Sequence, residues 1–150
     1  MKKKKFKIVP AAYLVLAKKK KVLMLRRFNT GYEDGNYSLV AGHLEGNESF
    51  RKCLVREAKE EANIILNEND LEIVHVMHRR TTFHDVGLRE RIDIFIAAKK
   101  WKGEIKNVEP HKCDDLSWFP LKKIPKNTIP YIKLVLKNIS KGVFYSEFGF

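Results

Sequence analysis

The chain has 150 residues, 44% of them hydrophobic and 32% charged, which is typical of a globular protein with a hydrophobic core. Its 8 glycines and 5 prolines are spread thinly, which excludes a low-complexity protein or a repeat array, and we expect one domain over residues 1–150. The formal net charge of +12 favours an anionic partner, but only eight of the 30 basic residues are Arg, so charge alone does not indicate nucleic acid.

The N-terminus combines a basic start with an apolar run, as a signal peptide does. Pro10 interrupts this run, however, and four lysines follow it where a small-residue cleavage site should lie. The run is also too short to span a bilayer, so no membrane association is expected. We predict instead that "KIVPAAYLVLA" and "KKVLMLRRF" are adjacent strands joined by a hairpin or loop.

The next segments predict a loop, a short strand and a helix. "TGYEDGNY" contains the Gly, Asn and Asp that are typical of a loop, and "SLVAG" predicts a short strand after it. The helix is expected to begin with Ser49 as its N-cap. Its apolar stripe would consist of Leu54, Val55, Ala58, Ala62 and Ile65.

The second half of the chain predicts three more strands and a second helix. The strands are expected in "LEIVHVMHRRTTF", "RIDIFIAAKKW" and "DDLSWF", with the polar "HDVGLRER" between the first two. Pro130 can begin the helix in "IPYIKLVLKNI", because proline is favoured in the first helical turn. Interspersed strands and helices favour a mixed α+β sandwich over a doubly wound sheet.

The two cysteines indicate the redox environment in which the protein works. Cys53 and Cys113 form neither a metal-binding spacing nor a disulfide framework, which suits a reducing cytoplasm. His111 lies near Cys113, but two potential ligands without a second pair do not indicate zinc. We therefore expect a cytoplasmic protein.

The first helix carries an acidic cluster in an otherwise basic chain. At about 100° per residue, Glu57, Glu60 and Glu61 fall within an arc of roughly 100° on one side. Glu57 and Glu61 are like charges at four-residue spacing and repel each other, which a helix surface selected only for stability would avoid. A divalent cation would relieve this repulsion, and carboxylates together with substrate phosphates suit Mg²⁺ or Mn²⁺. The cluster thus indicates phosphate ester or anhydride chemistry, with a solvated helix surface as the alternative.

Residues around this cluster have a characteristic spacing. Five residues separate Gly42 from Glu48, and seven separate Glu48 from Arg56. The full set of matching positions is Gly42, Glu48, Arg56, Glu57, Ala58, Glu60, Glu61 and Ile64. This pattern resembles the signature of the Nudix hydrolases, the MutT-like family. The resemblance implies an α/β/α sandwich with a mixed β-sheet, and hydrolysis of a nucleoside diphosphate linked to another moiety by water, with Mg²⁺.

The resemblance also implies roles for the charged residues. Glu57, Glu60 and Glu61 would be metal ligands, and one of them would assist deprotonation of the attacking water. Arg56 would orient the carboxylates through charge-assisted hydrogen bonds. Glu48 would support the cluster from the start of the helix.

Four further residues complete the implied site. Gly42 fits a tight turn near metal and substrate, and the Ala41 carbonyl would be a further metal ligand. Arg27 resembles a basic residue that lies near substrate phosphates in MutT-like proteins, with a merely surface-exposed Arg as the alternative. Glu109 sits where many members place another catalytic or metal-binding acid on a loop.

Two positions depart from the family pattern. Asn63 replaces the usual Gly, but Asn is the residue after Gly most willing to adopt a left-handed helix terminus, so we expect the C-cap to survive. Val40-Ala41-Gly42 replaces the usual Pro-Gly-Gly, which can alter how closely the backbone approaches the metal. All charged residues of the motif remain, so an active enzyme is expected.

Elimination gives a substrate class. Nudix proteins that act on ADP-ribose, diadenosine polyphosphates, coenzyme A or NADH often carry extra marks beyond the motif, and "HRRTTFHD" shows none of them. Together with the small size, this favours cleavage of a nucleoside triphosphate to the monophosphate and pyrophosphate. The alternatives are a nucleotide-sugar or dinucleoside polyphosphate hydrolase, and a non-catalytic nucleotide- or RNA-binding module. The intact acidic cluster argues against that binding module.

Overall fold

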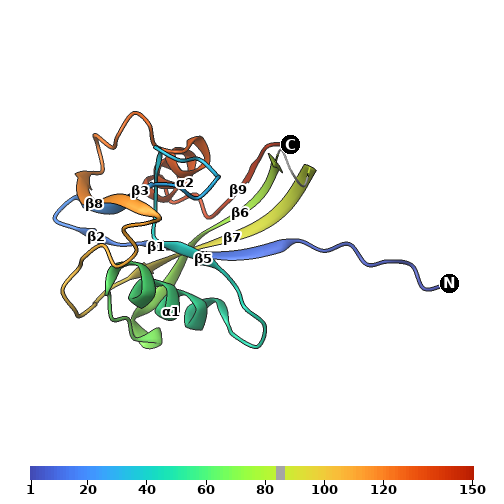
Figure 1. Cartoon of the computed structure of the whole chain (residues 1–150), viewed down its shortest axis with the longest axis horizontal. Coiled ribbons are helices and arrows are strands. Elements are labelled where there is room, and N and C mark those ends of the chain that lie inside the picture. Colours follow the sequence, from blue (N-terminus) through green and yellow to red (C-terminus); the bar gives the residue numbers. More distant parts are fainter. Residues whose placement is uncertain (84–86) are drawn as a thin grey trace.

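The computed structural model describes residues 1–83 and 87–150, and it places two sheets and two α-helices in this part of the chain (Figure 1). The larger sheet has the strand order β5-β1-β7-β6-β9, formed by Ala41–His43, Val9–Val15, Gly87–Ala98, Leu71–Phe83 and Tyr145–Phe148. It is mixed, because β1 runs parallel to β7 and β6 runs parallel to β9, whereas the other pairs are antiparallel. The smaller sheet contains β2 (Ala17–Lys18), β3 (Lys21–Arg27), β4 (Tyr37–Ser38) and β8 (Cys113–Pro120).

The helices cover opposite faces of the larger sheet. Side chains alternate along a strand, so Leu14 and Ile94 face α1 (Phe50–Ala62), whereas Tyr13 and Phe95 face α2 (Pro130–Ser140). Each helix packs its buried stripe into a separate hydrophobic cluster, one on each side of the sheet. This arrangement confirms the expected α+β sandwich with a mixed sheet, and α2 begins at Pro130 as predicted.

The predicted pairing of the first two long strands was wrong. β1 enters the larger sheet, and the hairpin partner of β3 is the short β2. The chain changes sheets at Leu16, which is fully buried and whose carbonyl accepts a hydrogen bond from Leu23 N–H at 3.0 Å. Both faces of β1 are covered, which explains why its apolar run is continuous rather than alternating.

The two ends of α1 follow local rules. Ser49 caps the start, because its side chain accepts a hydrogen bond from Lys52 N–H at 3.1 Å. Asn63 ends the helix in the left-handed conformation, with φ of 54°, as expected for a substitute of the usual Gly. The expectation that Ile65 extends the apolar stripe was wrong. The turn at Asn63 buries Ile64 instead and leaves Ile65 48% exposed.

Several smaller elements differ from the prediction. "SLVAG" is divided between β4 and β5, which belong to different sheets, and β9 was not predicted. A short 3-10 helix, Glu68–Asp70, precedes β6, and β7 already begins at Gly87. The rest of the predicted "HDVGLRER" divider, residues 84–86, lies outside the described residues.

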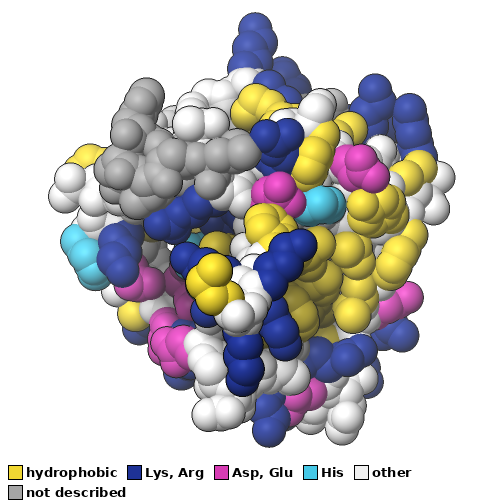
Figure 2. All heavy atoms as spheres, turned by 90° about the vertical axis from the view of Figure 1, so that its right-hand side faces the viewer, with side chains coloured by type: hydrophobic (Ala, Val, Ile, Leu, Met, Phe, Trp, Pro, Cys, Tyr) yellow, Lys and Arg dark blue, Asp and Glu magenta, His cyan; other side chains and the backbone are white. Residues whose placement is uncertain are grey.

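The surface is predominantly basic. On the face shown in Figure 2, Lys and Arg side chains outnumber acidic ones and surround an area of hydrophobic side chains. Among the described residues, neither α1 nor α2 has the length and apolar character needed to cross a membrane.

Candidate active site

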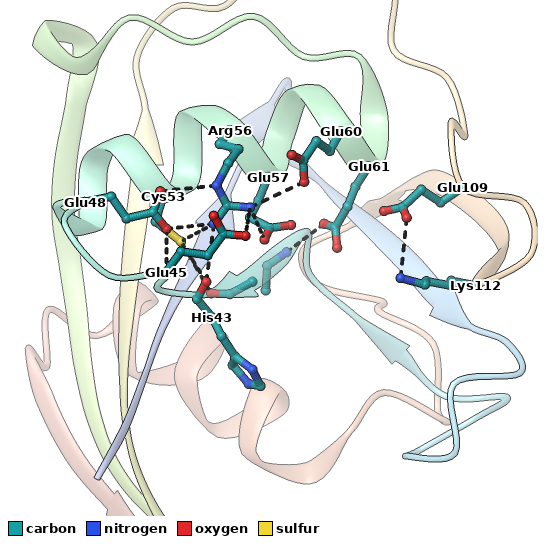
Figure 3. Close-up of polar contacts among 12 residues, drawn as sticks. His43, Glu45, Glu48, Cys53, Arg56, Glu57, Glu60, Glu61, Glu109 and Lys112 are labelled. Atoms are coloured by element: carbon teal, nitrogen blue, oxygen red, sulfur yellow. Dashed lines mark hydrogen bonds and ion pairs between the residues drawn. The ribbon is translucent and has the colours of Figure 1, made fainter. Parts of the chain in front are cut away.

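A cleft of about 600 Å³ lies beside α1, where it meets β5 and the loop before β8. Its walls include eight predicted site residues, namely Arg27, Ala41, Gly42, Arg56, Glu57, Glu60, Glu61 and Glu109. Glu48 does not line the cleft but contacts Arg56 directly. Figure 3 shows the carboxylates of α1 and Glu109 arranged along the same side of the helix. The fold therefore brings together residues from five separate segments of the sequence.

Gly42 is required by the position of Glu57. A Cβ atom added to Gly42 would overlap the carboxyl end of the Glu57 side chain. The Glu57 side chain is only 15% exposed and packs directly over the backbone of β5. The glycine of the motif thus lets an acidic side chain lie flat against the edge of the sheet.

Arg56 connects the acidic residues to one another (Figure 3). Its guanidinium donates two hydrogen bonds to Glu48, from Nη2 at 2.7 Å and from Nε at 3.2 Å. Nη1 donates to Glu57 at 2.8 Å and to Glu60 at 3.4 Å. The hydrogen bonds from Arg56 lower the pKa of Glu48 to about 2, so this carboxylate remains ionised at neutral pH.

Glu45, to which sequence reasoning assigned no task, is part of the same network. Its backbone N–H donates to Glu48 at 2.8 Å, and its carboxylate lies 3.7 Å from Arg56. The side chain is 72% exposed, so this ion pair adds little stability. The loop before α1 is nevertheless held to the helix by these contacts.

Glu61 lies deeper and has fewer partners. Its carboxylate accepts a hydrogen bond from Ala41 N–H at 3.0 Å. Burial raises the pKa of Glu61 well above its ordinary value, and the nearby charges of Glu57 and Glu109 raise it further. Burial also raises the pKa of Glu57. Two partly buried carboxyl groups therefore compete for too little positive charge.

A divalent cation fits this donor set. Among the described residues, no three acidic, His or Cys side chains already converge closely enough to hold an ion. Arg56 and the Ala41 N–H instead take up the carboxylates that would otherwise repel one another. A cation beside Glu57, Glu60 and Glu61 would supply the missing positive charge, and oxygen ligands of this kind suit Mg²⁺ or Mn²⁺.

Basic residues lie at the rim of the cleft. Arg27 is held by its own loop, because Nε donates to the Tyr32 carbonyl at 2.6 Å and Nη2 donates to Thr30 Oγ1 at 3.0 Å. Lys112, which sequence reasoning missed, lies 3.7 Å from Glu109 and also lines the cleft. Its position three residues after Glu109 was the available signal. Both side chains can attract a phosphorylated ligand.

The buried thiol beside the network is not reactive. Cys53 lies under β5, with Sγ 3.5 Å from the His43 carbonyl. Burial raises the pKa of Cys53 to about 12, so the thiolate is not formed at neutral pH. The Cys53 thiol therefore takes no part in acid–base chemistry beside the cleft at neutral pH.

A mixed sheet covered by an acidic helix, with basic residues lining the same cleft, is the arrangement expected of a protein that binds phosphorylated compounds. The family model described as NUDIX domain matches residues 7–138. The chain belongs to the Nudix family, and it is a hydrolase that acts on diphosphate bonds.

Solved structures share this fold. A MutT NUDIX hydrolase from Burkholderia pseudomallei is 20% identical, with a TM-score of 0.78 over 88% of this chain and 98% of that chain. A MutT protein from Methanosarcina mazei Go1 is 18% identical, with a TM-score of 0.73 over 89% of this chain and 94% of that chain. A UDP-X diphosphatase is 12% identical, with a TM-score of 0.64 over 98% of this chain and 70% of that chain. These likenesses confirm the expected Nudix-type sandwich.

Proposed function

We propose that the protein hydrolyses a nucleoside triphosphate to the nucleoside monophosphate and pyrophosphate, with Mg²⁺ or Mn²⁺ held by Glu57, Glu60 and Glu61. One water molecule is added across the bond between the α- and β-phosphates, so atoms balance without another reactant. The observation that carries the proposal is one cleft that is lined both by Glu57, Glu60 and Glu61 and by the basic Arg27 and Lys112. A cation there would also lower the raised pKa values of Glu57 and Glu61.

Each residue of the network has a definite part in this proposal. When bound, the cation neutralises phosphate charge and lowers the pKa of a water molecule. Arg56 holds Glu57 and Glu60 in place through Nη1, while Glu48 fixes the other edge of the guanidinium. The N–H group of Ala41 orients Glu61, and we assign the Ala41 carbonyl as a further ligand.

Substrate binding is assigned to the basic residues of the cleft. We assign the triphosphate to Arg27 and Lys112, which line the same cleft as the glutamates of α1, and Gly42 provides close approach of the backbone. We assign Glu109 as a further acidic ligand from its loop. Two buried free cysteines, Cys53 and Cys113, suit a reducing cytoplasm as the location.

The test is product identification with purified protein and Mg²⁺. The panel contains nucleoside triphosphates, nucleotide sugars and dinucleoside polyphosphates, because a UDP-X diphosphatase shares the fold. We expect triphosphates to give monophosphate and pyrophosphate. Glu60→Gln and Glu61→Gln should each lower kcat by about 100-fold or more, as loss of a group acting in the transition state does.

Glu72→Gln is the matched control, because Glu72 is an exposed glutamate of β6 that does not line the cleft. It should keep full activity. Absence of turnover of every compound, or unchanged turnover in both cleft variants, would refute hydrolysis by this site. Turnover of nucleotide sugars or dinucleotides alone would reassign the substrate. Salt-sensitive RNA binding without hydrolysis would instead favour a binding module.

A further inference from the structure

A second polar cluster, on β6 and β7, contributes Arg79 and Arg91 to the lining of the same cleft. Arg79 on β6 is directly opposite Arg91 on β7, and Asp93 follows two residues later on the same face of the sheet. The Arg79 side chain is 2% exposed and that of Asp93 is fully buried. Charged residues occupy sheet positions whose neighbours, Tyr13 and Phe95, belong to the hydrophobic core. Burial of this kind is costly unless every charge has a partner.

One hydrogen-bond donor of this cluster, Arg79 Nη2, has no acceptor in the part of the chain that the structure describes. Arg79 Nε donates to Asp93 Oδ2 at 2.7 Å, and Arg91 Nε lies 3.4 Å from Asp93 Oδ1. Both carboxylate oxygens are thus engaged by Arg. Arg79 Nη1 donates to the Tyr32 hydroxyl at 3.3 Å, whereas Nη2 is buried without a hydrogen-bond partner among the described residues. Two guanidinium groups share one carboxylate, which leaves a net positive charge.

The geometry fixes the orientation of this spare donor. The Arg79 guanidinium stacks on the ring of Tyr131, with its carbon 3.8 Å from the ring centroid. Stacking holds the plane of the guanidinium and directs its N–H groups sideways. Arg79, Arg91, Tyr131 and Tyr32 all line the cleft that contains the acidic residues. Asp93 engages only Nε of Arg79, so it leaves Nη2 available as a hydrogen-bond donor.

We propose that Arg79 Nη2 donates a hydrogen bond to a carbonyl oxygen of the substrate's nucleobase, so that the enzyme prefers keto bases to amino bases. This inference rests on the proposed function, in which the substrate is a nucleotide whose phosphates lie at α1. Guanine, hypoxanthine and uracil present an acceptor oxygen, whereas adenine and cytosine present an amino group at the equivalent position. An amino group at this position would meet Arg79 Nη2 donor to donor, because a guanidinium has no acceptor.

Two matched pairs of nucleotides test the inference in the wild-type protein. Inosine and adenosine nucleotides differ mainly at the 6-position, and uridine and cytidine nucleotides differ at the 4-position, oxygen replacing an amino group in each pair. We expect the keto member of each pair to have a kcat/KM about tenfold higher or more, since buried hydrogen-bonding groups reject an analogue that leaves them unpaired. The dissociation constants of the four monophosphates, measured by calorimetry without metal, should show the same order.

Arg79→Lys keeps the positive charge beside Asp93 but removes Nη2. This variant should bind both members of each pair within about threefold of each other. Arg51→Lys, at an exposed position of α1 outside the cleft, is the matched control and should keep the wild-type preference. Circular dichroism checks that both variants are folded.

Equal dissociation constants within both pairs in the wild-type protein would overturn the inference, whether or not Arg79→Lys folds. A full keto preference in folded Arg79→Lys would also overturn it. So would dissociation constants that change with the number of phosphates but not with the base. Absence of triphosphate turnover would refute the proposed function instead, and the metal-free binding constants would still decide the base preference.

Discussion

The Glu57 side chain fills the space that a Cβ atom at position 42 would occupy. Gly42→Ala should therefore displace the Glu57 carboxylate from the cleft. We expect kcat/KM to fall by about 100-fold, as a misplacement of about 1 Å can cause, and the Mg²⁺ concentration for half-maximal activity to rise. Steady-state kinetics over a Mg²⁺ series measures both quantities.

Gly46→Ala is the control for this substitution. Gly46 lies in the loop before α1, and an added Cβ would meet nothing within 4 Å. It should leave both quantities unchanged. Equal losses in the two variants would mean that loop stiffness, rather than overlap with Glu57, determines the activity.

Glu61 gives the metal-free protein a characteristic dependence of stability on pH. Burial holds its folded pKa well above the ordinary value. The contribution of Glu61 to the free energy of unfolding is therefore greatest below its unfolded pKa of about 4.3, and it is lost as pH rises through the folded pKa. We expect the free energy of unfolding of the wild type to fall across this range relative to Glu61→Gln, which cannot ionise. Urea denaturation in steps from about pH 4 to about pH 8 measures the difference.

Mg²⁺ should reverse this trend, because a cation stabilises the ionised form in the folded state. Added Mg²⁺ should stabilise the wild type more at neutral pH than at pH 4, and should stabilise Glu61→Gln less. Parallel pH curves for the two proteins would contradict the assignment of a raised pKa to Glu61.

Individual site residues differ in how far the sequence could predict them. Glu57, Glu60 and Glu61 share a helix, so periodicity alone places them together. Arg79 and Asp93 also left a signal, because alternation in "RIDIFIA" puts Asp93 on the face of the buried Phe95. Their meeting depends on the register of β6 against β7, which no local pattern fixes.

At the scale of elements, the end of α1 can be tested with a pair of variants. Asn63→Gly and Asn63→Ala both remove the side-chain bonds to Lys59 and to the Glu104 carbonyl. They differ only in a Cβ at a position with φ of 54°. We expect Asn63→Ala to be less stable than Asn63→Gly by about 1 kcal/mol, which is the cost of a left-handed conformation with a Cβ.

Urea denaturation of both variants measures this difference in the free energy of unfolding. Equal stability would show that the helix can end one residue earlier without cost. Activity should follow the same order, because the last turn of α1 carries Glu60 and Glu61.

Elements with strong local signals were predicted, and those made by long-range pairing were not. β6, β7, β8, α2 and most of α1 have clear apolar periods or caps. β9 is short and half exposed, and it exists because it pairs with β6, where His75 bonds both the Val143 carbonyl and Ser146 Oγ. The division of the first apolar run between two sheets likewise depends on β7, which lies far along the chain.

For the whole molecule, the excess of Lys and Arg bears on the rate of encounter with substrate. The chain has a formal net charge of +12, and Lys and Arg side chains are prominent on the face that Figure 2 shows. This charge attracts a polyphosphate over a distance that becomes shorter as the salt concentration rises. We expect kcat/KM for a triphosphate to fall several-fold between about 0.05 M and about 0.5 M NaCl, with little change in kcat.

Initial rates in chloride and acetate salts distinguish screening from specific anion binding. Equal dependence in both salts supports screening. A kcat/KM that is insensitive to ionic strength would show that the surface charge has no part in substrate capture.

The position of β1 inside the larger sheet, between β5 and β7, also has a consequence for biosynthesis. Its parallel partner is β7, with Ala11 opposite Asp93, so more than half of the chain lies between the paired residues. Pairing of such distant segments is slow, because a long loop must close before any contact compensates its entropy. On the ribosome, β1 emerges early and can pair with the short β5 on one edge, but its other edge stays unpaired until β7 is translated. The nascent chain is therefore most prone to aggregation, and most dependent on chaperones, during the synthesis of its first two thirds.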